Sequence, residues 1–295
     1  MYATPARGQT TRVAVALAIV YLAWGGTYPA IRVLVRDVPP LLGTGVRFVL
    51  AGALLAAFVA IRGGWRATRR EIVNATLVGT VILGDVGVLA LAERHVTAGL
   101  AALLIASVPL WIALLRVADG QCPPLVALLA VAVGFGGVAI LVLPDGGRQA
   151  APLGWMLVLV GAALVEAVGQ FGAQRIALPD TWTSTAVQFL GSGVVLVVLG
   201  VAIGELGEVR AGALTWSAAG AFVYLLLPGS LLAYGAFVWL LDNARIATVS
   251  TYAYVNPVVA VGAGWALLGE HVSPTMAAGA ALILGAVVLV VRERG

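Results

Sequence analysis

The chain has 295 residues, of which 61% are hydrophobic and 10% are charged, and its mean hydropathy is +1.05. Because a soluble domain carries about a quarter charged residues, this composition predicts an integral membrane protein. The net charge of +4 comes from 17 scattered arginines, which argues against nucleic acid as a partner. The single cysteine, Cys122, and two distant histidines, His95 and His271, predict no disulfide framework, no metal site and no cofactor.

Apolar stretches of roughly 20 residues, the length that crosses a bilayer, follow one another with short connections. Their sequences lack the alternation of a membrane β-barrel, so we expect an all-α membrane protein with ten transmembrane helices. In chain order the spans are expected at 13–34, 41–61, 72–92, 97–117, 123–143, 152–174, 182–203, 215–240, 246–268 and 274–291.

The distribution of arginine predicts the orientation of these spans. If the N-terminus lies inside, eleven of the 17 arginines fall in inner segments and five in outer loops, and Arg47 lies within a span. Because positive residues concentrate on the cytoplasmic side, both termini are expected in the cytoplasm, with the chain in a bacterial inner membrane.

The two halves of the chain resemble each other. Their matches are VRF (46–48) with VQF (187–189), LAER (91–94) with LLDN (240–243), Pro109 with Pro257, and Gly137 with Gly285. The last two pairs are both 148 residues apart (257 − 109 and 285 − 137). Such ordered matches indicate duplication, and we expect repeats at 1–147 and 148–295. Since each repeat has an odd number of spans, the second must be inverted, which is typical of secondary transporters.

Several motifs stand in a characteristic order: AWGGTYPAIRVLV in the first span, GVRFVLAGALL in the second, SVPLWIALL in the fourth, and NPVVAVGAGWALLGEHVSP near the end. With these motifs, nearly the whole chain resembles the ten-helix, EamA-type members of the drug/metabolite transporter superfamily. The resemblance implies an alternating-access carrier that exports amino acids, metabolites or drugs. The aromatic residues of spans one and eight are similar to those of YddG-type exporters of aromatic amino acids.

Ionisable side chains deep in a span are costly and indicate a binding site or pathway. Asp85 lies deep in the third span, and Glu166 lies in the sixth with Gln170 one helical turn later. A hydrogen-bonded seam between helices is the alternative for Glu166. Asp85 could instead be a protonated buried carboxyl or a partner of Arg47. For Arg47 we expect snorkelling to the surface or a role in holding helices together.

Aromatic residues form a second candidate set. Trp24 and Tyr28 lie four residues apart in the first span, Trp111 lies in the fourth, and Tyr234 and Tyr252 lie near the middle of later spans. Interfacial aromatic belts are the alternative, but they fit mid-span residues poorly. Aromatic faces could stack on a flat substrate or hold an ammonium group.

The segment STYAYVNP (250–257) interrupts the ninth span with polar residues and a proline. Tyr252 and Asn256 share one helical face, and Ser107 precedes Pro109 at the matching place in the fourth span. A proline kink with polar side chains on the freed carbonyls is the simpler explanation. The symmetry favours two walls of one central site. The full candidate substrate-binding set is Trp24, Tyr28, Asp85, Ser107, Trp111, Glu166, Gln170, Tyr234, Tyr252 and Asn256.

These features predict a secondary transporter in the lipid bilayer that exports small amphipathic metabolites, foremost amino acids and among them aromatic ones. A multidrug or other metabolite exporter of the same fold is the alternative, whereas a nucleotide-sugar or phosphate exchanger would need more cationic groups. An intramembrane serine protease is excluded because both histidines fall in predicted outer loops, so no enzyme is expected. The sequence leaves open proton coupling or facilitated diffusion, and the oligomeric state.

Overall fold

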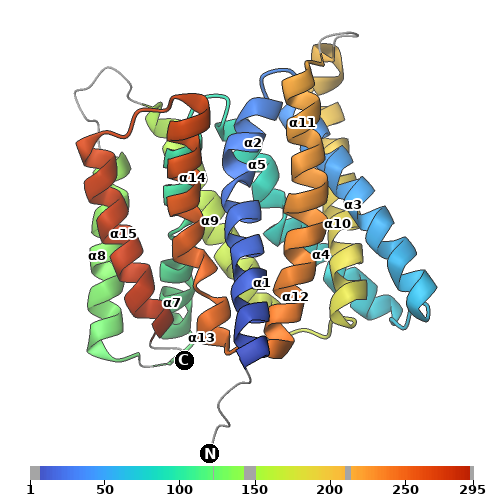
Figure 1. Ribbon diagram of the computed structural model, residues 1–295, viewed down its shortest axis with the longest axis horizontal. Coiled ribbons are helices and arrows are strands. Elements are labelled where there is room, and N and C mark those ends of the chain that lie inside the picture. The colour runs from blue at the N-terminus through green and yellow to red at the C-terminus, as the bar shows by residue number, and fades with distance from the viewer. Residues whose placement is uncertain (1–6, 122, 143–150, 210–213, 293–295) are drawn as a thin grey trace, which may run out of the picture.

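The computed structural model describes residues 7–121, 123–142, 151–209 and 214–292, and all regular secondary structure in these ranges is helical (Figure 1). Nine of its helical stretches are long and apolar enough to cross a membrane, and a shorter apolar helix completes the tenth span. The predicted ten-helix fold is confirmed. Cys122 and the predicted repeat boundary at residues 147 and 148 lie outside the described residues.

The helices of the two repeats follow one another in the expected order. The first repeat contains α1 (Arg7–Gly25) with α2 (Thr27–Leu34), α3 (Pro40–Arg62), α4 (Arg69–Ile82) with α5 (Gly84–Ala92), α6 (Ala98–Ile105) with α7 (Val108–Ala118), and α8 (Leu125–Val142). The second contains α9 (Leu153–Ala173), α10 (Thr181–Ala202), the 3₁₀ turn η1 (Glu205–Glu208), α11 (Trp216–Tyr224), the π-helix η2 (Leu225–Leu232) with α12 (Ala233–Asn243), α13 (Ile246–Val249) with α14 (Tyr252–Leu268), and α15 (Pro274–Arg292).

Several spans are interrupted halfway across, and proline accounts for part of this. Pro109 has no N–H to offer the carbonyl of Ile105, and α6 ends at Ile105. Pro228 lies inside η2, where the Ser230 hydroxyl donates a hydrogen bond to the Leu225 carbonyl at 3.0 Å. Non-regular backbone at this depth is tolerated because it is buried in protein or lines a cavity.

The interruption of the ninth span does not lie at Pro257. It lies at Ser250 and Thr251, and α14 continues from Tyr252 through Pro257. The Thr251 hydroxyl bonds to the Thr248 carbonyl and to the Tyr21 hydroxyl, so the polar groups freed at the break have partners there.

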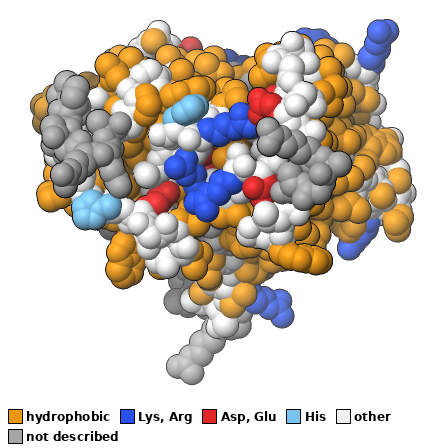
Figure 2. All heavy atoms as spheres, turned by 90° about the horizontal axis from the view of Figure 1, so that it is seen from above, with side chains coloured by type: hydrophobic (Ala, Val, Ile, Leu, Met, Phe, Trp, Pro, Cys, Tyr) orange, Lys and Arg blue, Asp and Glu red, His pale blue; other side chains and the backbone are white. Residues whose placement is uncertain are grey.

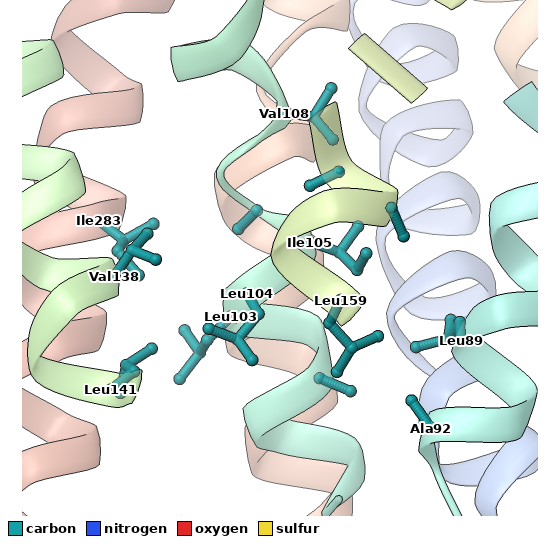
Figure 3. Packing of buried hydrophobic residues seen from close by; sticks show 14 of the residues in the cluster. Leu89, Ala92, Leu103, Leu104, Ile105, Val108, Val138, Leu141, Leu159 and Ile283 are labelled. Atoms are coloured by element: carbon teal, nitrogen blue, oxygen red, sulfur yellow. The ribbon is translucent and has the colours of Figure 1, made fainter. Parts of the chain in front are cut away.

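The two repeats interlock through equivalent spans. α3 packs along α10, and α8 packs along α15, so the second span meets the seventh and the fifth meets the tenth. α6 likewise packs against α14, the fourth span against the ninth. Figure 3 shows Leu103 and Leu104 of α6 near Leu159 of α9, and Val138 of α8 beside Ile283 of α15. The start of α1 and the end of α15 both lie at the lower end of the molecule in Figure 1.

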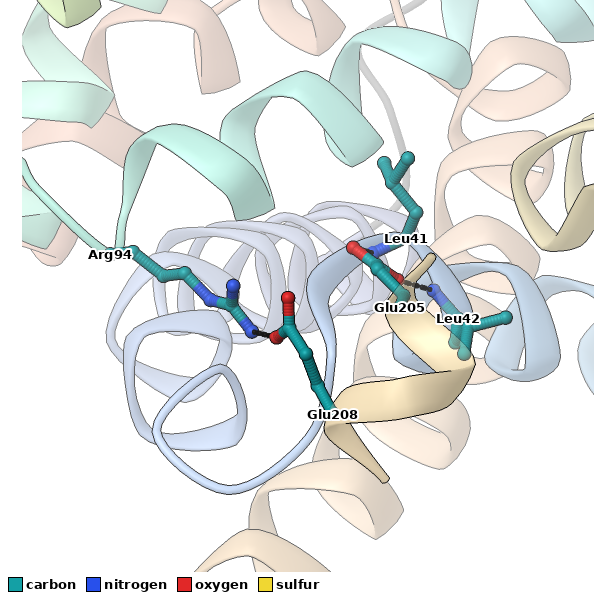
Figure 4. A network of polar contacts seen from close by, with 5 residues as sticks. All are labelled: Leu41, Leu42, Arg94, Glu205 and Glu208. Carbon is teal, nitrogen blue, oxygen red and sulfur yellow. Dashed lines mark hydrogen bonds and ion pairs between the residues drawn. The ribbon is translucent and has the colours of Figure 1, made fainter. Parts of the chain in front are cut away.

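Three glutamates of the second repeat, Glu205, Glu208 and Glu270, contact the first repeat at the upper end. Oε1 and Oε2 of Glu205 accept hydrogen bonds from the backbone N–H groups of Leu41 (3.1 Å) and Leu42 (2.8 Å) at the start of α3 (Figure 4). A helix N-terminus leaves such N–H groups without partners and favours negative charge, so the carboxylate caps α3. Figure 4 also shows the ion pair between Arg94 and Glu208, at 2.7 Å.

Glu270 does the same for α6. Its Oε1 accepts from the N–H of Ala98 (2.8 Å) and its Oε2 from that of Gly99 (3.0 Å). In both cases a carboxylate of the second repeat caps a helix of the first. Figure 2, seen from the upper end, shows arginine and acidic side chains gathered near the middle of this face.

Candidate functional site

A cavity of about 480 Å³ lies between the two repeats. Its volume falls within the range of about 300–1,000 Å³ that is usual for small-molecule sites. The cavity is lined by residues from most of the spans of both repeats, including the interrupted ones. Eight of the ten predicted site residues lie along it: Trp24, Tyr28, Asp85, Glu166, Gln170, Tyr234, Tyr252 and Asn256.

Two carboxyl groups meet in this cavity. Asp85 stands at the start of α5, directly after the break in the third span, and Glu166 faces it from α9. Two neighbouring carboxyl groups repel each other when both are ionised, so the pair is favoured when one of them carries a proton. Gln170 donates its Nε2 to Glu166 Oε1 at 2.7 Å, as the spacing along the helix predicted. The pair is therefore a small polar site that can hold one positive charge or proton.

Aromatic rings form the neighbouring wall of the cavity. The Trp24 ring lies 5.2 Å from the rings of Tyr234 and Phe237 and 5.3 Å from that of Tyr252, measured between centroids. These residues come from α1, α12 and α14, so three spans supply one aromatic cluster. Tyr252 meets Phe237 edge to face at 5.7 Å. Edge-to-face and tilted contacts fix ring orientations, and all four of these residues line the cavity.

Trp24 also holds the π-helix in place. Its indole Nε1 donates to the Gly229 carbonyl at 3.0 Å. Tyr28, beyond the break at Gly26, lines the same cavity as Glu166 and Asp85. Trp24 and Tyr28 thus reach the same cavity from two helices, whereas the sequence predicted one continuous helix.

Ser107 and Trp111, the other two predicted residues, do not line the cavity. Ser107 is fully buried in the break before α7, where its hydroxyl donates to the Leu104 carbonyl at 2.7 Å. Trp111 packs edge to face on Phe135 of α8, with centroids 4.5 Å apart. The break turns α7 so that Pro109 and its neighbours face the cavity, and Trp111 faces α8.

Arg47 differs from its prediction. The side chain is 4% exposed and lines the cavity, so the expectation that it snorkels to the surface is wrong. Gln188 lines the cavity from α10. These two residues are the central members of the VRF and VQF matches, and the flanking Phe48 and Phe189 rings touch at 5.2 Å. The repeat match was the signal that could have placed Arg47 in the site.

Two further predictions concern other parts of the chain. His95 and His271 lie in loops at the upper end, and His95 stacks on Trp155 at 4.7 Å. In the described ranges, no three His, Cys, Asp or Glu side chains are grouped as a metal site.

An inverted-repeat helical bundle with a cavity between its repeats is the architecture of secondary transporters. The chain belongs to the EamA-like transporter family, whose sequence profile matches residues 11–143 and 153–292, once in each half. This membership makes the protein a transporter and not an enzyme, and it agrees with the family resemblance found in the sequence motifs.

Several known proteins are similar to the chain. The uncharacterized inner membrane transporter YedA of Escherichia coli (strain K12) is 37% identical over 278 residues, covering 93% of this chain and 89% of YedA. A probable terminal-alkyne amino-acid exporter of Streptantibioticus cattleyicolor is 29% identical over 289 residues, covering 94% of this chain and 93% of that protein. One solved crystal structure matches with a TM-score of 0.64 at 20% identity, covering 95% of this chain and 96% of the other, and supports the fold.

Proposed function

We propose that this protein is an amino-acid exporter of a bacterial inner membrane, with both termini in the cytoplasm. The observation that carries the proposal is the Asp85–Glu166 carboxyl pair beside an aromatic wall in the central cavity. Similarity to YedA supports the membrane, and similarity to an amino-acid exporter supports the substrate class. The excess of arginine in segments at the lower end supports the orientation.

The carboxyl pair would receive the ammonium group of the substrate. An ammonium group supplies three donors, and the pair offers acceptor oxygens held in place by Gln170. Charge-assisted hydrogen bonds of this kind are short and strong where water is excluded.

The aromatic cluster would receive an apolar or aromatic side chain. Trp24, Tyr234 and Tyr252 are already packed by mutual contacts, so little rotamer freedom is lost when a substrate binds. Ring faces also attract an ammonium group, which places the two recognition elements side by side.

Export would be coupled to a proton. When the carboxyl groups share one proton, their net charge is −1; when both are ionised and hold an ammonium group, the total is again −1 (−2 + 1). Proton and substrate ammonium group would therefore replace each other at the carboxyl pair without a change in the charge of the pair. Alternating exposure of the site would then exchange one proton for one amino acid.

Transport by purified protein in liposomes tests this proposal. Radiolabelled amino acids, including phenylalanine, leucine and alanine, are offered with and without a pH gradient. We expect at least one apolar amino acid to accumulate in the liposomes to an extent that grows with the pH gradient. In Glu166→Gln, this accumulation should be strongly reduced. Asp242→Asn, which alters an exposed acid near the end of α12, is the matched control and keeps its transport. If no amino acid moves through the wild-type protein, the proposal fails.

Export of hydrophobic amines is the second candidate function. A carboxyl pair beside aromatic rings also fits an amine that has no carboxylate. The same liposomes, offered an amine with an aromatic tail, compare the two candidates directly.

A further inference from the structure

Arg47 is a buried cation without an anionic partner in the described part of the chain. It lies in α3, 4% exposed, with its Cζ 4.4 Å from the centroid of the Phe48 ring. Its Nε is buried and has no hydrogen-bond partner, and the two ion pairs found among the described residues involve other arginines. A guanidinium inside a membrane protein normally pairs with a carboxylate, because an unpaired buried charge is costly.

The two carboxyl groups of the same cavity do not fill this role. Asp85 and Glu166 lie beside each other, Gln170 bonds to Glu166, and neither carboxyl group is in the ion pairs found among the described residues. Tyr234 of α12 lines the same cavity, but a phenol is not an anionic partner for a guanidinium. The cavity therefore has a positive pole on α3 and a negative pole between α5 and α9.

The surroundings of Arg47 suit a carboxylate from outside the protein. A guanidinium presents its donors as a planar fork that matches the two oxygens of a carboxylate. Gln188, the repeat counterpart of Arg47, lines the same cavity and is held by a 2.8 Å hydrogen bond from its Nε2 to Ser184. The positive pole, the negative pole and the aromatic cluster thus come from different helices around one space.

We infer that Arg47 binds the carboxylate of the transported substrate, so that the site selects zwitterionic α-amino acids over amines that lack a carboxylate. This inference rests on the proposed function and deepens it. Three separate contacts (carboxylate to Arg47, ammonium to the carboxyl pair, side chain to the aromatic cluster) also discriminate between L and D forms, because only one enantiomer meets all three.

The test compares substrates that differ only in the carboxylate. L-phenylalanine and phenethylamine form one pair, and L-leucine and 3-methylbutylamine form the other, each assayed by uptake into proteoliposomes. Loss of a charge-assisted contact corresponds to about 10- to 100-fold in transport efficiency, so the wild-type protein should prefer each amino acid to its amine by such a factor.

Variants of Arg47 sharpen the comparison. In Arg47→Gln, transport efficiency should fall at least ten times more for the amino acid than for the amine. Arg47→Lys should retain part of the preference for the amino acid. The matched control is Arg62→Gln, which removes a guanidinium that lies 5.0 Å from the Phe58 ring at the exposed end of the same helix. This control should keep the wild-type preference.

The possible outcomes separate the two claims. Wild-type protein that moves amine and amino acid equally well overturns the role of Arg47 and leaves a transporter of amine-bearing substrates. An unchanged preference in Arg47→Gln also overturns it. If Arg47→Gln does not fold, the wild-type substrate pairs and Arg47→Lys still decide. Wild-type protein that moves neither class contradicts the proposed function itself.

Discussion

The Oε2 atom of Glu270 occupies the space beside Gly264 that a side chain would need: a Cβ added to Gly264 would lie 2.5 Å from it. Glu270 lies where it can cap α6 because the preceding helix has no side chain at that position. Glu205 has the same relationship to Gly200, where a Cβ would lie 2.9 Å from its Oε2. The contact between the repeats at the upper end therefore depends on two glycines as well as two glutamates.

Gly264→Ala should displace Glu270 and remove the cap from Ala98 and Gly99. We expect a loss of stability of about 1–3 kcal/mol, the cost of leaving buried N–H groups without a partner. Thermal unfolding in detergent measures it. Gly262→Ala is the matched control, since a Cβ there meets no atom within 4 Å. Equal unfolding temperatures for the two variants would contradict the capping role of Glu270.

Gly26→Ala should destabilise the break in the first span. A Cβ at Gly26 would lie 2.2 Å from the Tyr224 hydroxyl, which donates to the carbonyls of Leu22 (2.9 Å) and Ala23 (3.2 Å). Because Tyr224→Phe removes the same hydroxyl, the two substitutions should be non-additive, and the double variant should lose less stability than the sum. If the stability losses of the two single variants add up to that of the double variant in a double-mutant cycle, this explanation is wrong.

Tyr252→Leu should weaken transport of phenylalanine more than that of alanine. Aromatic pair contacts are worth about 0.5–1.5 kcal/mol, which corresponds to about 2- to 12-fold in transport efficiency. Competition between labelled substrates in proteoliposomes measures the ratio. Trp216→Leu, at a residue that is 95% exposed, serves as the control and should leave the ratio unchanged. A uniform loss for both substrates in Tyr252→Leu would instead indicate a structural role.

The ionisation of Glu93 should make the free energy of unfolding fall as the pH rises. This residue lies in the loop after α5, fully buried, and neither carboxyl oxygen has a hydrogen-bond partner among the described residues. Burial raises the pKa of Glu93 well above its ordinary value of 4.5; Arg32 lowers it in part and Glu270 raises it further. The folded protein therefore keeps this proton at pH values where the unfolded chain has lost it. The stability gained below the unfolded-state pKa is lost as the pH rises through the folded-state pKa.

Glu93→Gln, which mimics the protonated side chain, should flatten this dependence. We expect the variant to be more stable than the wild-type protein at pH 8 and close to it at pH 5, measured as unfolding temperature in detergent. A wild-type protein that gains stability between pH 5 and pH 8 relative to the variant would contradict the assignment.

The fold was predictable because a long apolar run identifies each span in the sequence. Even the inverted repeat followed from matches such as Pro109 with Pro257. What the sequence could not supply are contacts between distant segments: Glu205 and Glu270 lie more than 160 residues from the N–H groups that they cap. A glutamate in a loop carries no local signal of the helix end that it will meet.

The site was partly predictable because ionisable residues are conspicuous in an apolar span. Asp85 and Glu166 are costly in a membrane, so their presence alone pointed to a cavity. Ser107 and Trp111 do not line the cavity, because the break before α7 changes which face of that helix meets it. For Arg47, depth along the helix allows either snorkelling or an inward position, and only the packing of α3 against α10 decides between them.

Proton release on substrate binding tests the central claim most directly. L-phenylalanine is added to purified protein in weakly buffered detergent near neutral pH, and released protons are counted with a pH-sensitive dye. If the substrate ammonium replaces the shared proton of Asp85 and Glu166, the wild-type protein should release one proton per molecule bound, and Glu166→Gln should release none. Tight binding by the wild-type protein without proton release, or unchanged release in Glu166→Gln, would contradict it.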